Sequence, residues 1–265
     1  TEGDFTITSK SITDTDITVS SITDLVYNGS LQRPKPMVED DSNLLAEGID
    51  YRLSYSDNTN VGTATVTVTG IGNYSGTKDV TFDITLAPLT ITAEDTTKEF
   101  GEVDPSLTVS YTGFVNAEDQ EDLTGTLSIS RVSGEAVSTY AITASGLTST
   151  NYDITYTPGT FAITSRLITQ SAITVSPITD LVYTGLGQTP SPEVKDGATV
   201  LVKDMDYELS YAANTNVGQA TVTVTGKGNY NGTKDVTFAI TPAPLTIIAE
   251  DKSKVFGEVD PELTV

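Results

Sequence analysis

The sequence repeats itself at a fixed offset of 156 residues. The run NTNVG begins at Asn58 and again at Asn214, and FGEVDP begins at Phe100 and again at Phe256. Residues 11–109 align with the chain 156 positions later without a gap, and roughly two-thirds of the paired residues are identical. A period of this length fits one domain or two small ones. The repetition favours a spacer or a multivalent surface over a single catalytic centre.

Apolar and polar residues alternate along short runs within each period. Residues 63–69 and 89–93 alternate strictly, which predicts strands with one buried and one solvated face. Threonine, valine and isoleucine are abundant, and no window shows helical periodicity. Each half of the period, about 75 residues long, is the size of a small β-sandwich. We therefore predict an all-β fold of tandem Ig-like β-sandwich modules in an elongated array.

The two halves of the period differ, and we name them type A and type B modules. The closing run of type B, GTFAITS at Gly159, aligns with GDFTITS at Gly3. The predicted order is therefore the last strand of a preceding type B module at 1–10, type A at 11–86, type B at 87–166, type A at 167–242, and the truncated start of a second type B module at 243–265.

The C-terminal segment is too short to form a sandwich by itself. An unpaired strand exposes a row of backbone hydrogen-bonding groups. We therefore expect residues 243–265 to pair with a neighbouring sheet edge or with another chain, and the truncated ends to make edge-strand contacts with neighbouring chains.

The charge and the missing residue types exclude several classes of function. The chain has 36 acidic and 14 basic residues, for a net charge of -22, so its surface repels nucleic acid. Cysteine and histidine are absent, which excludes disulfides, zinc-thiolate sites and the commonest general base. No apolar run approaches 18 residues, so we expect no direct membrane insertion.

Longer motifs resemble a known family of bacterial repeats. Type B contains LTITAEDTTKEFGEVDPSLTVSYTGFV and NYDITYTPGTFAIT and resembles the bacterial MBG repeat. Type A contains GIDYRLSYSDNTNVGTATVTVTG and resembles the companion Ig-like repeat of bacterial surface proteins. The resemblance implies Ig-like modules of large, adhesin-like proteins that are secreted or held at the bacterial cell surface. It implies no catalytic residues and no cofactor.

Carboxylates are the only plentiful groups with catalytic or metal-binding chemistry. A carboxylate pair can hydrolyse a glycosidic bond, but the acidic pairs recur in both periods, which a single active site does not need. Calcium prefers several carboxylate and carbonyl oxygens, and a solvated acidic loop is the simpler alternative. The calcium candidates are Glu94, Asp95, Glu102, Asp104, Glu250, Asp251, Glu258 and Asp260.

The glycine-rich stretch at Gly70–Gly76 resembles a phosphate-binding loop only superficially, because no helix is predicted after it. We expect a turn in which Tyr74 folds back onto the sandwich, as does Tyr230 in the second copy. Exposed tyrosines could alternatively stack on sugars.

Two functions remain open from the sequence. Short junctions that contain proline, at residues 86–89 and 242–245, favour a semi-rigid stalk because proline restricts the backbone. The alternative is a multivalent adhesin module that binds a host or environmental glycan or protein, since linked weak sites gain avidity.

Overall fold

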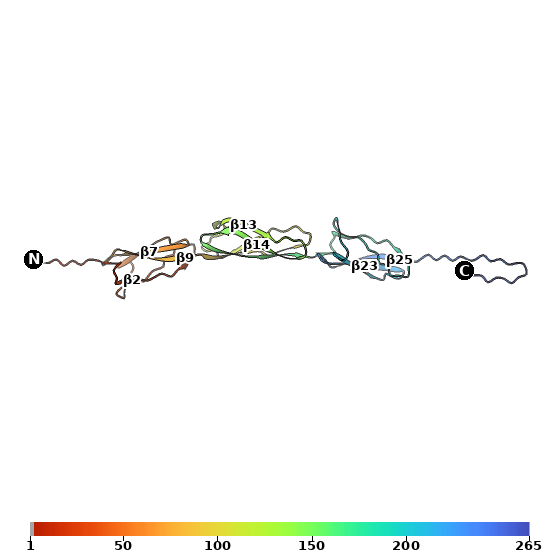
Figure 1. Ribbon diagram of the computed structural model, residues 1–265, viewed down its shortest axis with the longest axis horizontal. Coiled ribbons are helices and arrows are strands. Elements are labelled where there is room, and N and C mark those ends of the chain that lie inside the picture. Colours follow the sequence, from red (N-terminus) through yellow and green to blue (C-terminus); the bar gives the residue numbers. More distant parts are fainter. Residues whose placement is uncertain (1–2, 265) are drawn as a thin grey trace. The chain divides into compact units, whose positions relative to one another are not determined.

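The computed structural model describes residues 3–264, and its regular structure is almost entirely β-strand. Figure 1 shows the strands gathered into separate sandwiches along the chain. Residues 1–2 and 265, which belong to the predicted terminal segments, lie outside the described residues. The prediction of an all-β chain of tandem β-sandwich modules is confirmed.

The first sandwich consists of two sheets and a short parallel pair. One sheet has the order β3-β9-β7-β6, the other the order β2-β4-β5, and β1 pairs in parallel with β8. Their bounds are β1 (Lys10–Ser11), β2 (Ile17–Val19), β3 (Leu25–Val26), β4 (Val38–Asp40), β5 (Asn43–Leu44), β6 (Tyr51–Ser56), β7 (Gly62–Gly70), β8 (Tyr74–Ser75) and β9 (Thr77–Thr85).

The central sandwich has a three-stranded and a four-stranded sheet, ordered β12-β10-β15 and β11-β16-β14-β13. The first strand, β10, pairs in parallel with β15 and antiparallel with β12. The bounds are β10 (Ala87–Ala93), β11 (Thr96–Glu99), β12 (Val109–Thr112), β13 (Thr124–Arg131), β14 (Ser138–Thr148), β15 (Tyr152–Thr157) and β16 (Gly159–Thr164). A 3-10 turn, η1 (Gln120–Asp122), is the only helical element in residues 3–264.

The third sandwich repeats the first strand for strand at the 156-residue offset. Its sheets are ordered β19-β25-β23-β22 and β18-β20-β21, and β17 pairs in parallel with β24. The bounds are β17 (Arg166–Leu167), β18 (Ile173–Val175), β19 (Leu181–Val182), β20 (Val194–Asp196), β21 (Thr199–Val200), β22 (Tyr207–Ala212), β23 (Gly218–Gly226), β24 (Tyr230–Asn231) and β25 (Thr233–Thr241).

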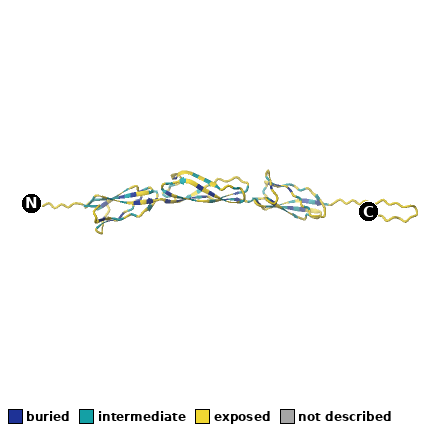
Figure 2. Cartoon of the chain, viewed as in Figure 1, coloured by how far each residue is buried: buried dark blue, intermediate teal, exposed yellow. Residues whose placement is uncertain are grey.

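The cores are built from the alternating residues of the long strands. Ala64, Val66 and Val68 on β7 are fully buried, while the threonines between them are partly exposed. This is the pattern that the sequence predicts for a strand with one solvated face. Figure 2 shows the buried positions concentrated within the sandwiches.

The described chain divides into two compact units. The first contains Thr1–Thr96, Asp104–Gly134 and Thr139–Ala162, and the second contains Thr97–Val103, Glu135–Ser138 and Ile163–Val265. The first unit therefore holds the junction of the first and central sandwiches, and the second holds the junction of the central and third. The residues that form each junction therefore belong to a single unit.

The two terminal segments carry no core packing of their own. Phe5 is 89% exposed, whereas Phe161, its counterpart on β16, is completely buried. Leu245 is likewise exposed, whereas its counterpart Leu89 on β10 is buried. Figure 2 shows both segments as exposed along their length.

The expected pairing of the C-terminal segment with a sheet edge of the same chain is wrong. No strand lies between residues 242 and 264. In the central sandwich the equivalent β10 is held between β12 and β15. Residues 243–264 match only β10 and β11, so neither neighbour of β10 is present for them, and two isolated strands are at best marginally stable. Pairing with another chain stays a prediction, as do the module boundaries.

Removing residues 1–8 and 245–265 together should leave the melting temperature of the chain unchanged, because residues 3–8 and 245–264 are all exposed and add nothing to a core. Differential scanning calorimetry of the full and trimmed chains measures this. A lower melting temperature for the trimmed chain would contradict it. Sedimentation of both chains tests edge pairing: a dimer found only for the full chain is the result that pairing through the ends predicts.

Candidate functional site

The first junction has almost no linker. β9 ends at Thr85 and β10 begins at Ala87, so Leu86 alone separates the first sandwich from the central one. The Ala87 amide donates a hydrogen bond to the Asn151 carbonyl at 3.0 Å, which ties the start of β10 to the loop before β15. The Asn151 side chain in turn accepts a hydrogen bond from the Val61 amide at 3.2 Å.

One apolar cluster runs through this junction. Its buried members in the first sandwich are Tyr27, Ala64, Val66, Phe82 and Ile84, and those in the central sandwich are Ala87, Leu89, Ile91, Leu123 and Tyr152. The two sandwiches therefore share a core at this end, because the two sets of buried side chains form one contacting cluster.

Two tyrosines and one glutamate close the junction. The Tyr27 ring meets the Tyr152 ring edge-to-face, with centroids 5.6 Å apart. The Tyr27 hydroxyl donates to Glu118 Oε1 at 2.6 Å, and the Tyr152 hydroxyl donates to Glu118 Oε2. Glu118 thus accepts one hydrogen bond from each sandwich, and such bonds to a charged acceptor are stronger than neutral ones.

The loop that carries Glu118 is shaped by unusual backbone geometry. Asn116 and Ala117 have positive φ angles of 52° and 60°. The Asn116 side chain donates to the Gly29 carbonyl of the first sandwich at 2.8 Å. A Cβ atom on Gly29 would lie 2.5 Å from Asn116 Cβ, so the approach requires glycine. Asp119 then caps η1 in a capping box that fixes the end of the loop.

The third sandwich has the same tyrosine and glycine at the equivalent positions, but no further sandwich within residues 3–264 packs on them. Tyr183 is the counterpart of Tyr27 and is 39% exposed, against 5% for Tyr27. Gly185 is the counterpart of Gly29, and a Cβ there would meet only the Tyr183 hydroxyl, at 3.9 Å. The burial of Tyr27 therefore results from the central sandwich and not from the type A fold itself.

The second junction has a different chemistry. Ser165 alone separates β16 from β17. The Phe100 ring meets the Tyr230 ring edge-to-face at 5.5 Å, and it packs on the core of the third sandwich. Arg166 Nε lies 3.2 Å from Asp196 Oδ2, and both side chains are largely buried. An aromatic contact between Phe100 and Tyr230 replaces the glutamate and tyrosines of the first junction. The Arg166–Asp196 pair lies within the third sandwich, as the Lys10–Asp40 pair does in the first.

Two polar contacts complete the second junction. Gln170 Nε2 donates to Glu99 Oε1 at 2.5 Å, and the Val137 amide donates to Asn229 Oδ1 at 2.9 Å. Each joins the end of the central sandwich to the third within one compact unit.

Burial and nearby carboxylates raise the pKa values of the tyrosine hydroxyls at both junctions. Burial, with the Glu118 hydrogen bond as the next cause, raises the pKa of Tyr27 to about 12. The pKa of Tyr152 is raised by burial and by the same glutamate. At the second junction, burial and then the charge of Asp196 raise the pKa of Tyr230 to about 12. All three rings are therefore held in the neutral form that donates a hydrogen bond.

The glycine-rich stretch forms the expected turn. Tyr74 packs against the core of the first sandwich and donates to Asp40 Oδ2 at 3.0 Å. Tyr230 does the same with Asp196 at 3.2 Å. The prediction that these tyrosines fold back onto the sandwich is confirmed.

The structure does not bring the calcium candidates together. In the central sandwich Asp95 accepts a hydrogen bond from the Thr160 amide at 2.6 Å, and Asp104 pairs with Arg131 Nε at 2.6 Å. Glu102 lies 3.8 Å from Arg166 Nη1. Glu94 is exposed and belongs to none of these contacts.

The C-terminal candidates behave similarly. Glu250 pairs with Lys252 at 2.6 Å, and Asp260 pairs with Lys254. Asp251 and Glu258 are exposed. Nowhere in residues 3–264 do three or more acidic side chains gather as a metal ion requires.

The central sandwich matches one protein family. Residues 89–162 match the model of the MBG domain (YGX type). The match extends from β10 into β16, so the resemblance to MBG repeats is confirmed for this sandwich. The flanking sandwiches lie outside the matched residues. A search of the curated proteins returns no match.

Solved structures with several extracellular modules are weakly similar. Sidekick-1 immunoglobulin domains 1–5 are 10% identical, with 90% of this chain and 60% of that chain covered and a TM-score of 0.30. Extracellular cadherin domains 1–5 of protocadherin gamma B2 are 10% identical, with 89% and 60% covered and a TM-score of 0.20. The chain spans 60% of the length of either structure, and likenesses at these TM-scores carry no functional inference. Within residues 3–264 no helix is long and apolar enough to cross a membrane.

The positions of the junctions are predictable from the sequence, but the side chains that contact one another across them are not. Glu118 lies in an acidic run that is typical of a solvated loop, and its partner Tyr27 is 91 positions away. A usable signal was the identity of Tyr27 and Tyr183 in the two type A copies, since a tyrosine retained at a module end often marks a contact surface.

The denaturation midpoint should fall as the pH rises from 10 toward 12. Tyr27 titrates near 10 when unfolded but near 12 when folded, so in this range the unfolded state binds fewer protons and gains stability. Tyr27→Phe should weaken this dependence, as followed by urea denaturation at a series of pH values. Tyr183→Phe is the matched control and should not change the slope. Equal slopes in all three proteins would contradict the burial of Tyr27 beneath the central sandwich.

Calcium should leave the melting temperature unchanged. Asp95 and Asp104 contact a backbone amide and an arginine of the protein, and no three acidic side chains in residues 3–264 lie together. A divalent ion therefore finds no preformed set of ligands there. Melting curves in millimolar calcium and in excess chelator measure this. A rise in calcium alone would reinstate a metal site at the acidic residues.

Proposed function

We propose that the chain is a non-catalytic, semi-rigid spacer from the repeat region of a large bacterial cell-surface or secreted protein. The supporting observation is the apolar core that continues from the first sandwich into the central one. A flexible linker would leave each module with its own closed core, whereas here the modules complete one another.

Bending at the first junction has an energetic cost. Opening it would expose the Tyr27 and Tyr152 rings, and full burial of a large apolar side chain contributes about 1.5–3 kcal/mol. It would also separate Glu118 from one of its two donors, and a hydrogen bond to a charged group contributes about 1.5–3 kcal/mol. These terms favour one relative orientation of the two modules over many.

Both the family resemblance and the side-chain chemistry support a non-catalytic role. The resemblance of the central sandwich to MBG repeats implies an extracellular bacterial protein, and this is the basis for proposing the cell surface or secretion. In the central sandwich one member of each acidic pair that could serve as acid and base is already engaged: Asp95 accepts a hydrogen bond and Asp104 lies in an ion pair. Cysteine and histidine are absent from the whole chain.

The alternative of a multivalent adhesin requires the same ligand surface on each type A copy. The copies share their strands, but the segment 39–47 differs from 195–203 at most positions. This divergence favours the spacer, because a repeated ligand site would constrain both copies.

Small-angle X-ray scattering of the intact chain should report an elongated particle with limited flexibility. Glu118→Ala should broaden the distribution of particle dimensions, because it removes the acceptor shared by the two sandwiches. Glu121→Ala is the control, since it removes a carboxylate from the same loop without touching the junction. A compact particle, or equal flexibility in all three proteins, would contradict the spacer.

A further inference from the structure

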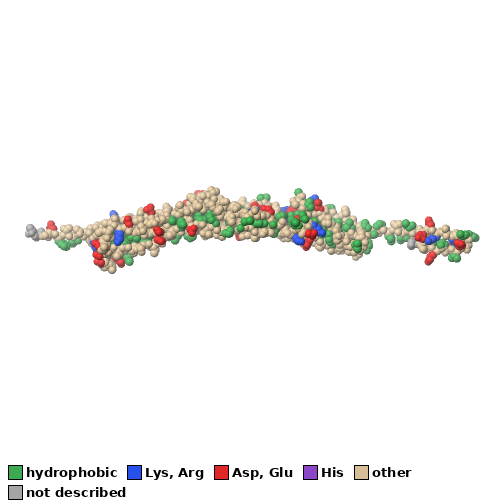
Figure 3. Space-filling view, viewed as in Figure 1, with side chains coloured by type: hydrophobic (Ala, Val, Ile, Leu, Met, Phe, Trp, Pro, Cys, Tyr) green, Lys and Arg blue, Asp and Glu red, His purple; other side chains and the backbone are tan. Residues whose placement is uncertain are grey.

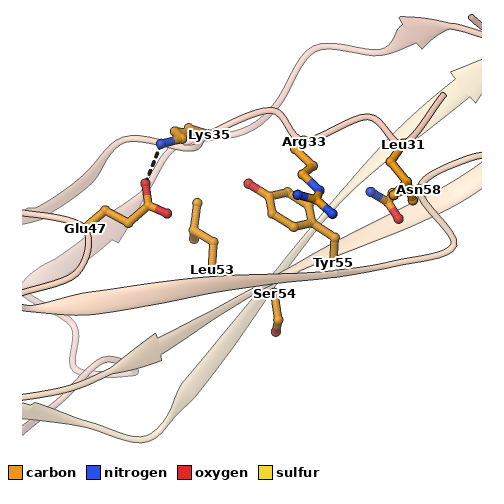
Figure 4. Close-up of a pocket in the computed structure, with 8 residues that line it drawn as sticks. All are labelled: Leu31, Arg33, Lys35, Glu47, Leu53, Ser54, Tyr55 and Asn58. Atoms are coloured by element: carbon orange, nitrogen blue, oxygen red, sulfur yellow. Dashed lines mark ion pairs between the residues drawn. The ribbon is translucent and has the colours of Figure 1, made fainter.

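The first sandwich has an open groove beside β6. Its volume is about 550 Å³, and Tyr55 and Leu53 of β6 form one wall. Arg33 and Lys35, from the segment between β3 and β4, form the other. Figure 4 shows these four side chains on the same side of the strand, with Ser54 pointing away. A volume of this size suits a small ligand such as one or two sugar rings.

The framework of the groove is the same in both type A copies. The Tyr55 hydroxyl donates to the Pro34 carbonyl at 3.0 Å, and the Tyr211 hydroxyl donates to the Pro190 carbonyl at 3.0 Å. The Asn58 side chain donates to the Gln32 carbonyl at 2.7 Å, and the corresponding bond in the third sandwich is 2.8 Å. The backbone on which the groove is built therefore does not depend on its charged residues.

The charged residues of the groove differ between the two copies. Thr189 occupies the position of Arg33, and Ser191 occupies the position of Lys35. Lys203 occupies the position of Glu47. Matching backbone frameworks therefore carry two basic residues beside a glutamate in the first sandwich, and two hydroxyl residues beside a lysine in the third.

The two basic residues of this wall are unusual in a chain that is strongly acidic. Only 14 of the 265 residues are lysine or arginine, and the net charge is -22. Figure 3 shows basic groups as a few separate patches on the face in view. Lys35 pairs with Glu47 at 2.7 Å, whereas the Arg33 guanidinium makes no ion pair or hydrogen bond with any residue in 3–264. Arg33 thus offers a planar set of donors to an incoming anion.

The walls complement one class of ligand. A guanidinium matches a carboxylate with two parallel hydrogen bonds. The Tyr55 ring and the Leu53 side chain supply an apolar surface beside it, which suits the CH face of a pyranose. An acidic peptide would satisfy the cations but would leave the aromatic wall without a specific partner.

We propose that this groove binds a saccharide that carries a carboxylate, such as a uronic acid residue, with Arg33 on the carboxylate and Tyr55 against the sugar ring. The site is present once per chain, on the first sandwich. It is independent of the spacer role, so either proposal can fail without the other. The third sandwich serves as a control within the same molecule.

A titration of the intact, isotope-labelled chain with a glucuronate-containing disaccharide tests the proposal by NMR. Backbone amides of residues 31–33 and 35 should shift in a saturable manner, and those of residues 187–189 and 191 should not. The double variant Arg33→Thr/Lys35→Ser carries the residues of the third sandwich and should keep the fold. We expect its affinity to fall at least about tenfold, a change of about 1.4 kcal/mol.

Three further probes separate the sources of binding. A neutral disaccharide, in which glucose replaces the uronic acid, should bind at least about tenfold more weakly than the acid. A sulfated disaccharide that has no carboxylate and that bound equally would overturn the carboxylate specificity. A tetra-aspartate peptide that bound while the uronate disaccharide did not would overturn the saccharide assignment.

A graft provides the reciprocal test. Thr189→Arg/Ser191→Lys/Lys203→Glu rebuilds the charged wall on the third sandwich, whose framework already matches. We expect the amides of residues 187–189 and 191 to begin to shift with the uronate disaccharide. No binding to the natural chain, or binding that survives Arg33→Thr/Lys35→Ser, would overturn the proposal.

Discussion

The carboxylate of Glu118 accepts a hydrogen bond from a tyrosine on each of two sandwiches, and the joint depends on that arrangement. The tyrosine rings can be buried because their hydroxyls have a charged acceptor. With the rings buried, one apolar cluster extends through the junction. Gly29 permits the loop of Glu118 to approach so closely. Removing the carboxylate would leave two buried donors unsatisfied, which is costly in an apolar setting.

The two junctions fix the orientation of consecutive modules with different side chains. At the second, Arg166 and Asp196 form a largely buried pair, and Phe100 covers Tyr230. Both junctions use one aromatic pair from facing modules. Glu118 adds a charged acceptor at the first junction, whereas the Arg166–Asp196 pair lies within the third sandwich. Both junctions also leave a single residue between consecutive strands. Orientation is thus set by side chains from distant loops, because the linkers are too short to contribute contacts.

Strand positions were predictable from the sequence, whereas the joint was not. The alternation at Ala64, Val66 and Val68 is a local property, and burial followed it. Glu118 and Tyr27 meet only after both sandwiches form, so no local pattern marks them. The C-terminal segment repeats the alternation of β10 but stays exposed, since strand pairing depends on neighbours that its own residues cannot supply. The groove at Arg33 is visible only in space, where four scattered differences between the copies line one pocket.

The parallel pairing of β3 with β9 has a mechanical consequence. β3 is the third strand of the first sandwich, after β1 and β2, and β9 is its last. A pull on the two ends of that sandwich slides these strands along each other once the load reaches β3. Their hydrogen bonds are loaded together, whereas a hairpin pulled at its open end would lose them one at a time. The same pairing recurs between β19 and β25. Each type A module is thus arranged to carry tension in shear.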